Sequence, residues 1–236
     1  MSAAAPGRIV AIIPARGGSK GIPRKNLMPV CGRPLIQWSV LQARACAAVE
    51  SVWVSSDDDE ILAVAAEAGA RPVKRPAEIS GDKAQSEAAW LHALDAVERE
   101  TGPVGLLLLM QATSPIRAPG DIDAALAQYA AEGLDTLFSA AEVEDYFTWR
   151  RDEAGAPQSV NYDWRNRRLR QSIERRWLEN GSFYLTRPAI LRGTSNRLGG
   201  KIGIFVMDRF KMFQIDSRDD ARLCEVIMHG YGYDRA

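Results

Sequence analysis

The sequence predicts an α/β fold built on a mostly parallel sheet, and three observations carry this prediction. Short apolar strands alternate with helical patterns through the first two-thirds of the chain, which implies parallel strands with helices on both faces. A glycine-rich basic loop directly follows the first strand, at the sheet edge where open α/β folds bind ligands. The length of 236 residues fits one such domain, with or without a sizeable appendage.

Each of the first elements has a local reason in the sequence. Residues 8–14 form a buried strand that is apolar through its middle and is stopped by a proline. A helix begins at Pro34, where the missing amide hydrogen costs little. Residues 51–56 form the second strand. The four acids at 57–60 favour the start of the next helix, which stops at Gly69.

The middle of the chain continues this alternation. A helix around Trp90 leads to residues 105–110, the strongest strand prediction in the chain because it is almost wholly apolar. A further helix from 121 to about 131 leads to a strand at 134–140. These elements complete the expected strand–helix units of the sheet domain.

The periodic pattern stops after Glu142. Residues 144–180 are rich in Arg, Trp and Asn without a clear period, and we expect 144–200 to be an arm attached to the sheet domain. Strands are predicted again at 181–186 and 203–207. A helix from 219 to about 229 is expected to close the chain.

Composition excludes several classes of function. The chain holds 30 Lys+Arg and 30 Asp+Glu, a balance that argues against a nucleic-acid binder or a membrane-surface binder. Its three cysteines form no CxxC pair, which suits a reducing compartment. Residues 1–7 lack the build of a signal peptide, and apolar runs such as 106–110 are too short to cross a bilayer. We therefore expect a cytoplasmic protein with no nucleic-acid or membrane partner.

The loop of residues 15–26 favours a polyphosphate ligand. It combines three closely spaced glycines with four cations: Gly17, Gly18, Gly21, Arg16, Lys20, Arg24 and Lys25. Glycines let backbone N–H groups approach a phosphate closely, and the cations balance its charge. The spacing matches neither GxxxxGK[ST] nor GxGxxG, so the two most familiar phosphate motifs are excluded.

Four segments, in order, carry a resemblance to a known family. They are IIPARGGSKGIPRKN at 12–26, QATSPIR at 111–117, Arg170-Gln171 with ENGSFY at 179–184, and QID at 214–216. Together they resemble the motifs of the acylneuraminate cytidylyltransferases, the CMP-sialic acid synthetase family. The resemblance spans residues 8 to about 228, and its first motif is the most specific.

The resemblance implies a Rossmann-like nucleotide-diphospho-sugar transferase fold and a nucleotidyltransferase activity. Residues 1–143 and 201–236 would bind the nucleotide, and the arm 144–200 would serve dimerisation and sugar binding. Enzymes of this family transfer CMP from CTP to the anomeric hydroxyl of an α-keto sugar acid and release pyrophosphate. Mg²⁺ would be the cofactor, and CTP and a nine-carbon sugar acid the substrates.

The resemblance also assigns residues to the nucleotide and to catalysis. The nucleotide contacts would come from Ala15, Arg16, Gly17, Lys20, Lys25, Asn26 and Ser86. Lys25, Arg16 and Asp216 would be the catalytic residues, with Lys25 nearest the α-phosphate. For Ser86 an alternative stays open, because it or Asp82 could simply cap the helix that starts there.

The sugar acid would be bound by a second set of residues. They are Gln111, Thr113, Ser114, Arg170, Gln171 and Asn180. Gln111 could instead bond the edge of the cytosine, since a neutral amide suits either ligand. Arg117 could fix the turn by bonding local carbonyls. The arginine-rich run 165–176 could by itself suggest RNA binding, which the neutral charge of the whole chain disfavours.

Asp216 is the predicted Mg²⁺ ligand, expected at the end of a short strand at 212–215. The family commonly has Asp-Ile-Asp here, whereas this chain has Gln214-Ile215-Asp216. Alternation along a strand would put residues 214 and 216 on one face, so a neutral amide replaces the second acid. One fixed carboxylate suffices for Mg²⁺ when phosphates and water supply other ligands.

Three alternatives and one assembly hypothesis remain from the sequence. The acid could be an eight-carbon Kdo-type acid, the fold could serve a non-catalytic CTP- or sugar-binding protein, or, least favoured, the chain could bind RNA. Trp149, Trp164 and Trp177 would be hard to bury in a monomer of this size. They predict a homodimer in which a neighbour's residues complete the sugar pocket.

Overall fold

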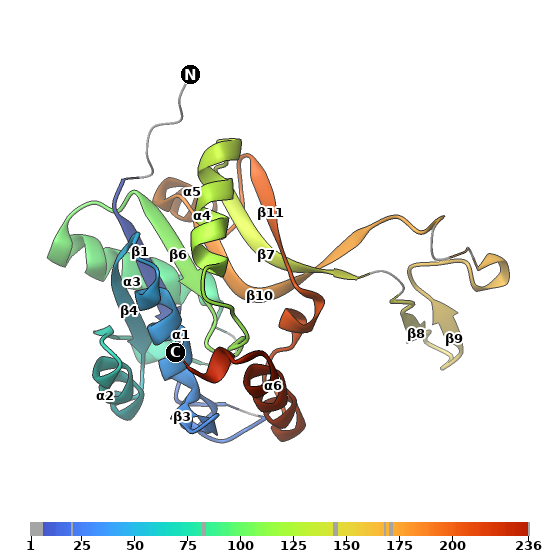
Figure 1. Ribbon diagram of the computed structural model, residues 1–236, viewed down its shortest axis with the longest axis horizontal. Helices are drawn as coiled ribbons and strands as arrows, with labels where there is room; N and C mark the ends of the chain where they lie inside the picture. The colour runs from blue at the N-terminus through green and yellow to red at the C-terminus, as the bar shows by residue number, and fades with distance from the viewer. Residues whose placement is uncertain are drawn as a thin grey trace.

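A seven-stranded mixed sheet runs through the body of the molecule (Figure 1). The computed structural model describes residues 7–19, 21–81, 84–143, 146–167, 169 and 172–235. From edge to edge the strands are β11 (Ile202–Met207), β7 (Thr136–Val143), β10 (Arg176–Thr186), β6 (Leu106–Met110), β1 (Ile9–Pro14), β4 (Val49–Ser56) and β5 (Arg71–Lys74). Only β10 runs antiparallel to its neighbours, β6 and β7. The predicted α/β class with a mostly parallel sheet is therefore confirmed.

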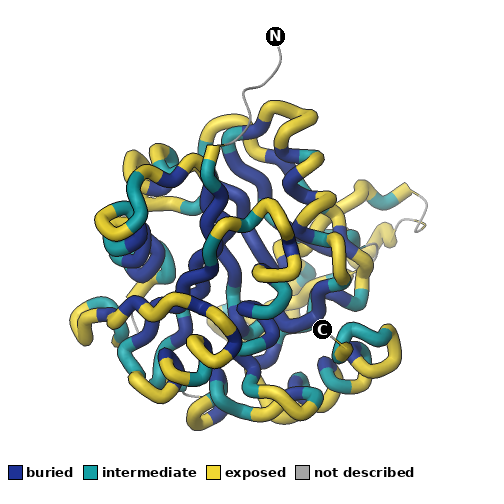
Figure 2. The backbone as a smooth tube through the Cα atoms, turned by 60° about the vertical axis from the view of Figure 1, so that its left-hand side comes forward, coloured by how far each residue is buried: buried dark blue, intermediate teal, exposed yellow. Residues whose placement is uncertain are grey.

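Helices cover both faces of this sheet (Figures 1 and 2). They are α1 (Leu35–Ala45), α2 (Asp59–Glu67), α3 (Ser86–Thr101), α4 (Asp121–Glu132), α5 (Pro188–Thr194) and α6 (Arg218–Tyr231). Alternate β1 residues face opposite sides: Ile9, Ala11 and Ile13 pack with α1, α2 and α4, whereas Val10 and Ile12 pack with α3 and α5. A strand buried on both faces needs a continuous apolar run, as the sequence predicted for β1.

A third apolar cluster fixes the C-terminal helix below the sheet. Met228 and Cys224 of α6 pack against Trp38 of α1 and Ile215. The small hairpin of β2 (Pro29–Val30) and β3 (Arg33–Pro34) supplies Val30 to the same cluster. This packing holds the segment before α6 close to the loop after β1, which positions the site described below.

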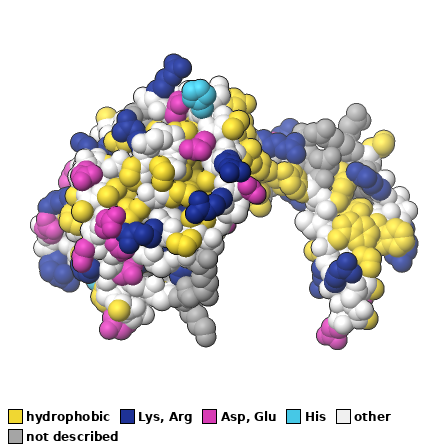
Figure 3. Space-filling view, turned by 90° about the horizontal axis from the view of Figure 1, so that it is seen from below, with side chains coloured by type: hydrophobic (Ala, Val, Ile, Leu, Met, Phe, Trp, Pro, Cys, Tyr) yellow, Lys and Arg dark blue, Asp and Glu magenta, His cyan; other side chains and the backbone are white. Residues whose placement is uncertain are grey.

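An arm projects from the sheet where β7 and β10 continue together past its edge (Figures 1 and 3). Beyond them lies the hairpin of β8 (Trp149–Arg151) and β9 (Pro157–Ser159). The far half of β10 pairs with β6 inside the sheet, and Leu191 of α5 packs in the core. The predicted arm, 144–200, thus includes one strand and one helix that lie on the body.

Most elements agree with the sequence predictions, and one does not. The expected strand at 212–215 is wrong: Arg209–Met212 form a 3-10 helix, and the residues after it are not in a strand. Their backbone is held instead by the N–H of Ile215, which donates to the carbonyl of Thr113. Five strands and one helix were missed: β2, β3, β5, β8 and β9, with α5.

Within the described residues, no helix is long and apolar enough to cross a membrane.

Candidate active site

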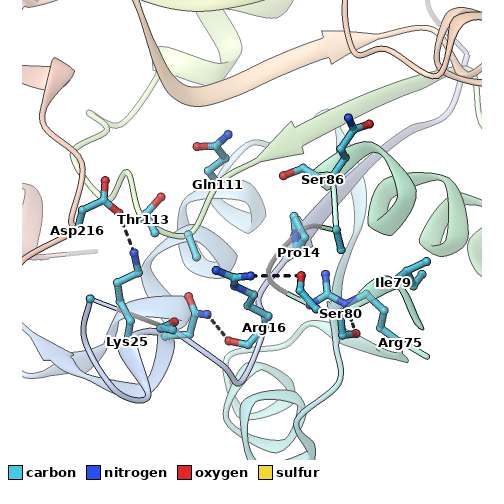
Figure 4. Close-up of a pocket in the computed structure, with 17 residues that line it drawn as sticks. Pro14, Arg16, Lys25, Arg75, Ile79, Ser80, Ser86, Gln111, Thr113 and Asp216 are labelled. Carbon is cyan, nitrogen blue, oxygen red and sulfur yellow. Dashed lines mark hydrogen bonds and ion pairs between the residues drawn. The ribbon is translucent and has the colours of Figure 1, made fainter. Parts of the chain in front are cut away.

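A cavity of about 550 Å³ opens at the carboxyl ends of β1 and β6 (Figure 4). Four segments form its wall: the loop after β1, residues from 75–81 and 84–86, the turn 111–113, and Asp216. This is the edge of the sheet at which the sequence predicted a ligand. Of the predicted site residues, the cavity brings together Arg16, Lys25, Asn26, Ser86, Gln111, Thr113 and Asp216.

Two glycines explain how the loop after β1 fits against its neighbours. A Cβ on Gly17 would lie 2.8 Å from Oδ2 of Asp58, at the start of α2. A Cβ on Gly21 would lie 2.6 Å from the carbonyl oxygen of Asp216. Both contacts are too short for any side chain, so glycine is required at each end of the loop.

Two hydrogen bonds on either side of these glycines shape the loop. Asn26 is buried, and its Nδ2 donates to the carbonyl of Arg16 at 3.0 Å. The Arg16 side chain reaches across the cavity to the carbonyl of Gly81, at 3.4 Å (Figure 4). Asn26 therefore acts on the shape of the loop, and Arg16 presents its guanidinium to the cavity.

Lys25 and Asp216 form an ion pair across the cavity mouth. Nζ of Lys25 lies 2.9 Å from Oδ1 of Asp216 and donates to the carbonyl of Ile215, also at 2.9 Å (Figure 4). The Lys25 side chain is 15% exposed, whereas that of Asp216 is 77% exposed. The carboxylate thus keeps open coordination positions while its lysine partner is fixed.

Arg75 is a wall residue that the sequence prediction did not select. It is buried, with Nε donating to Oγ of Ser80 at 3.1 Å and Nη2 lying 3.5 Å from Oδ1 of Asp57. Burial lowers the pKa of the Arg75 guanidinium, which Asp57 partly offsets. A basic residue before a proline is a weak signal in a single sequence, since only the fold turns it toward the cavity.

The amides of Gln111, which lines the cavity, and of Gln214 both lie close to Gly181. A Cβ on Gly181 would lie 2.5 Å from Oε1 of Gln111 and 3.1 Å from Nε2 of Gln214. Nε2 of Gln214 donates to the carbonyl of Asn180 at 2.9 Å. The amide that replaces the expected acid is therefore anchored to the backbone as a donor, a bond that a carboxylate could not make.

Four predicted site residues do not present a side chain to the cavity. Asn180 is fully buried, with Oδ1 accepting from Ser139 and Nδ2 donating to the carbonyl of Lys211. Ser114 is buried and donates to the carbonyl of Asn180. Substrate contacts from these two side chains are not supported, because the core uses their polar groups. Ala15 and Gly17 offer only backbone, and their N–H groups donate to Ser55 and Asp57.

Arg117 fixes the turn that carries Gln111, as one of the alternatives predicted. Its guanidinium is buried and donates to Oγ of Ser39, Oε1 of Gln42 and the carbonyl of Gln111. Burial lowers its pKa to about 9. Arg117 thereby sets the backbone position from which Gln111 enters the cavity.

Of the remaining predicted residues, Ser86 lies at the start of a helix and the others lie outside the described part of the chain. Ser86 begins α3 and lines the cavity, while Gln85 occupies the cap position without a side-chain cap bond. Lys20, Arg170 and Gln171 lie outside the described residues, as does Asp82.

Asp216 is the one carboxylate among the described residues that line the cavity. Over the same described residues, no group of three potential ligands among His, Cys, Asp and Glu is found. The nearby Asp220 is used as a cap: Oδ2 accepts from the N–H groups of Asp216 and Ser217, which close the first turn of α6. Its hydrogen bond with Ser217 lowers its pKa. The donor set suits a cation such as Mg²⁺, which needs only one or two carboxylates when a bound polyphosphate supplies further oxygens.

Comparison with known proteins places the chain among cytidylyltransferases. A family model described as cytidylyltransferase matches residues 10–165. The N-acylneuraminate cytidylyltransferase of Oncorhynchus mykiss is 36% identical over 229 residues, which cover 95% of this chain and 51% of that protein. The chain thus spans about half the length of this relative. A pseudaminic acid cytidylyltransferase of Campylobacter jejuni is 28% identical over 222 residues, 92% of this chain and 94% of that protein.

Solved structures share the fold at low sequence identity. The CMP:2-keto-3-deoxy-manno-octonic acid synthetase complexed with CTP superposes with a TM-score of 0.72 at 17% identity, covering 95% of this chain and all of that one. The 4-diphosphocytidyl-2C-methyl-D-erythritol synthase of Anaerococcus prevotii gives a TM-score of 0.64 at 11% identity, covering 95% and 97%. The expected Rossmann-like nucleotidyltransferase fold is therefore confirmed.

Proposed function

This chain belongs to the cytidylyltransferase family, and on that basis we propose that it transfers CMP from CTP to the anomeric hydroxyl of a nine-carbon α-keto sugar acid. One observation carries the proposal: the glycine-rich basic loop, Arg75, the turn at Gln111 and the carboxylate of Asp216 converge on a single cavity. The resemblance of the whole chain to enzymes named for acylneuraminate and pseudaminic acid supports the class of acceptor.

The triphosphate is assigned to the loop after β1. Arg16 and Lys25 both line the cavity and supply positive charge on its loop side. Hydrogen bonds from charged donors to phosphate are worth about 1.5–3 kcal/mol each. Lys25 is the group nearest the α-phosphate in this assignment, so it must exchange its bond with Asp216 for one with the nucleotide.

The base is assigned to the opposite end, beside Arg75 and Ser86. A guanidinium carries only donors, which suits the N3 and O2 acceptors of cytosine. Uracil presents a donor at N3 and would oppose Arg75 at that position. This chemistry supports CTP as the nucleotide.

The sugar acid is assigned to the end formed by Gln111 and Thr113, whose amide and hydroxyl suit sugar hydroxyls. Arg170 stays the predicted partner of its carboxylate, and Gln171 stays a predicted contact of the sugar acid. The anomeric oxygen attacks the α-phosphorus, the bond to the bridging oxygen breaks, and pyrophosphate leaves. Catalysis of this kind depends on positioning and on stabilising the developing charge, which Arg16 and Lys25 would do.

Asp216 would hold Mg²⁺ together with phosphate oxygens of CTP. When bound, the ion neutralises charge on the phosphates and on the departing pyrophosphate. The exposure of Asp216 supports this role, because its side chain is 77% exposed and only Oδ1 pairs with Lys25.

We place the enzyme in the cytoplasm, where its three free thiols would stay reduced, and propose that it acts as a homodimer. Exposed aromatic side chains on the arm support a second copy as its partner.

The test is release of pyrophosphate from CTP and Mg²⁺ with a panel of eight- and nine-carbon α-keto sugar acids, with ATP, GTP and UTP as controls. Turnover with CTP and one nine-carbon acid is expected. Turnover only with an eight-carbon acid would replace the acceptor class. CTP binding without turnover on any acid would favour a binding protein and overturn the proposal.

A further inference from the structure

We infer that Asp57 is a positioning residue that holds the phosphate loop and the base-reading Arg75 with a single carboxylate oxygen. The inference rests on the proposed function, which assigns the phosphate loop to the triphosphate of CTP and Arg75 to its base. Asp57 does not line the cavity itself and lies behind the wall that both groups form.

The first contact is with the phosphate loop. The N–H of Gly17 donates to Oδ1 of Asp57 at 3.0 Å. Gly17 follows Arg16 directly, and its lack of a side chain lets the loop press against the start of α2. This contact is possible because β1 and β4 are paired neighbours with Pro14 opposite Ser55, so the loops that follow them emerge side by side.

The second contact is with Arg75, through the same oxygen. Nη2 of Arg75 lies 3.5 Å from Oδ1 of Asp57, and the backbone N–H of Arg75 donates to the carbonyl of Ser56 at 2.8 Å. Arg75 is 6% exposed and feels the repulsion of the Arg16 cation. A buried cation beside another cation needs an opposite charge to remain in place, and Asp57 supplies it.

The two aspartates that follow Asp57 directly, Asp58 and Asp59, have other hydrogen-bond partners. Asp58 caps α2 by accepting from the N–H groups of Glu60 and Ile61 at 2.9 and 3.2 Å. Asp59 pairs with Lys74 on the surface, at 2.6 Å. The three aspartates at 57–59 thus have separate roles, and only the first contacts both groups of the nucleotide pocket.

Sharing one acceptor couples the two ends of the pocket. When Arg75 moves, Oδ1 of Asp57 moves with it, and so does the N–H of Gly17 that donates to this oxygen. The positions of the base end and the phosphate end of the pocket therefore depend on each other. Loss of the charge at residue 57 should therefore weaken CTP binding and also relax the choice between CTP and UTP. A residue needed only for folding would lower stability without changing that choice.

The experiment compares Asp57→Asn with the matched control Asp59→Asn, which removes the same charge two residues away. Asp57→Asn keeps an acceptor for Gly17 but loses the charge that holds Arg75. We expect its dissociation constant for CTP, measured by calorimetry, to rise about 10-fold, the loss of one charge-assisted contact. The CTP-to-UTP ratio of kcat/KM should fall, while the KM for the sugar acid stays unchanged and Asp59→Asn behaves as wild type.

A double-mutant cycle tests the coupling itself. Arg75→Ala should cost CTP binding much less in the Asp57→Asn background than alone, because the two residues act as a unit. Additive losses, or an Asp57→Asn protein with wild-type affinity and base selectivity, would overturn the inference while leaving the proposed function intact. Failure of the wild-type protein to bind CTP would instead remove the proposed function and the inference with it.

Discussion

Asp216 lines the cavity, and Gln214 lies two residues before it in the chain; the contacts of the two side chains predict different sensitivities to substitution. Asp216→Asn removes the only carboxylate among the described cavity residues, so we expect kcat to fall at least about 100-fold. Gln214→Asp loses a donor to the carbonyl of Asn180, which still accepts from Ser114. We expect this variant to change kcat/KM by less than about threefold. Pyrophosphate release over a range of Mg²⁺ concentrations measures both.

Gln214→Glu serves as the control, since it keeps the length of the side chain and adds the charge. A large gain in activity from either acidic variant at position 214 would contradict the view that one carboxylate suffices. It would show instead that the amide limits the reaction.

The three thiols should be poorly reactive in the folded protein. Burial raises the pKa of Cys31 to about 11 and that of Cys224 to about 12, and it also raises the pKa of Cys46. The thiolate is the reactive form, so at pH 8 Cys31 holds about 100-fold less of it than an ordinary cysteine. Labelling with iodoacetamide, read by mass spectrometry, should be slow at pH 8 and faster toward pH 10. All three should react quickly in urea; rapid labelling without urea would contradict the burial.

The site residues show where prediction from one sequence stops. The motifs selected segments that the structure brings together, because Arg16, Lys25 and Asp216 line one cavity. Side-chain direction within a motif depends on tertiary packing, which the sequence does not display. Asn180 belongs to the same motif as Gly181, yet its side-chain amide makes hydrogen bonds to buried partners in the core and does not face the cavity. Arg75 faces the cavity only because Asp57 and Ser80 hold it there.

At the scale of elements, the loop after β1 yields a prediction with a built-in control. Gly21→Ala would put a methyl group 2.6 Å from the carbonyl oxygen of Asp216. Around a Cβ on Gly18, by contrast, no atom of the described residues beyond its two chain neighbours lies within 4 Å. The loop must move away from Asp216 in the first variant. A shift of about 1 Å in a positioned group can cost about 100-fold in rate, so we expect a loss of that size in kcat/KM.

Gly18→Ala should lose less than about threefold. Equal losses in the two variants would mean that backbone freedom matters in this loop and not the contact with Asp216. Steady-state kinetics with CTP as the varied substrate, together with a melting temperature for each variant, separates the two explanations.

Elements were predictable where burial imposes a pattern. β1 and β6 are buried on both faces, so their apolar runs identify them. β5 is a four-residue edge strand containing Pro72, with only one buried residue, and such a strand leaves little pattern to read. The strand expected at 212–215 failed for another reason. Ile215 is buried by α6 and the hairpin at Val30, so its apolar character reflects tertiary packing of a loop residue and does not indicate a strand.

At the scale of the whole molecule, the arm is the feature that a monomer does not explain. Trp149, Trp164 and Trp177 are 47%, 50% and 42% exposed, and hydrophobic side chains gather on the projecting part (Figure 3). Large exposed apolar patches mark interaction sites. The aromatic rings also pack against each other, with Trp149 and Trp164 6.4 Å apart between centroids, so the surface is ordered before a partner arrives.

We therefore predict that light scattering at micromolar concentration gives about twice the chain mass of 25.9 kDa. Replacing both Trp149 and Trp164 with Ser removes aromatic anchors, which dominate binding energy in interfaces, and should give the monomer mass. Val226→Ser removes an even more exposed apolar residue from α6, far along the chain from the arm, and should leave the dimer intact. If a neighbour's arm completes the sugar pocket, the monomeric variant should bind CTP normally but show a KM for the sugar acid raised at least about 10-fold. A monomeric wild-type protein would exclude the dimer. A monomeric variant with full activity would show that each subunit holds a complete site, because the nucleotide and sugar ends of the cavity would then be formed by one chain.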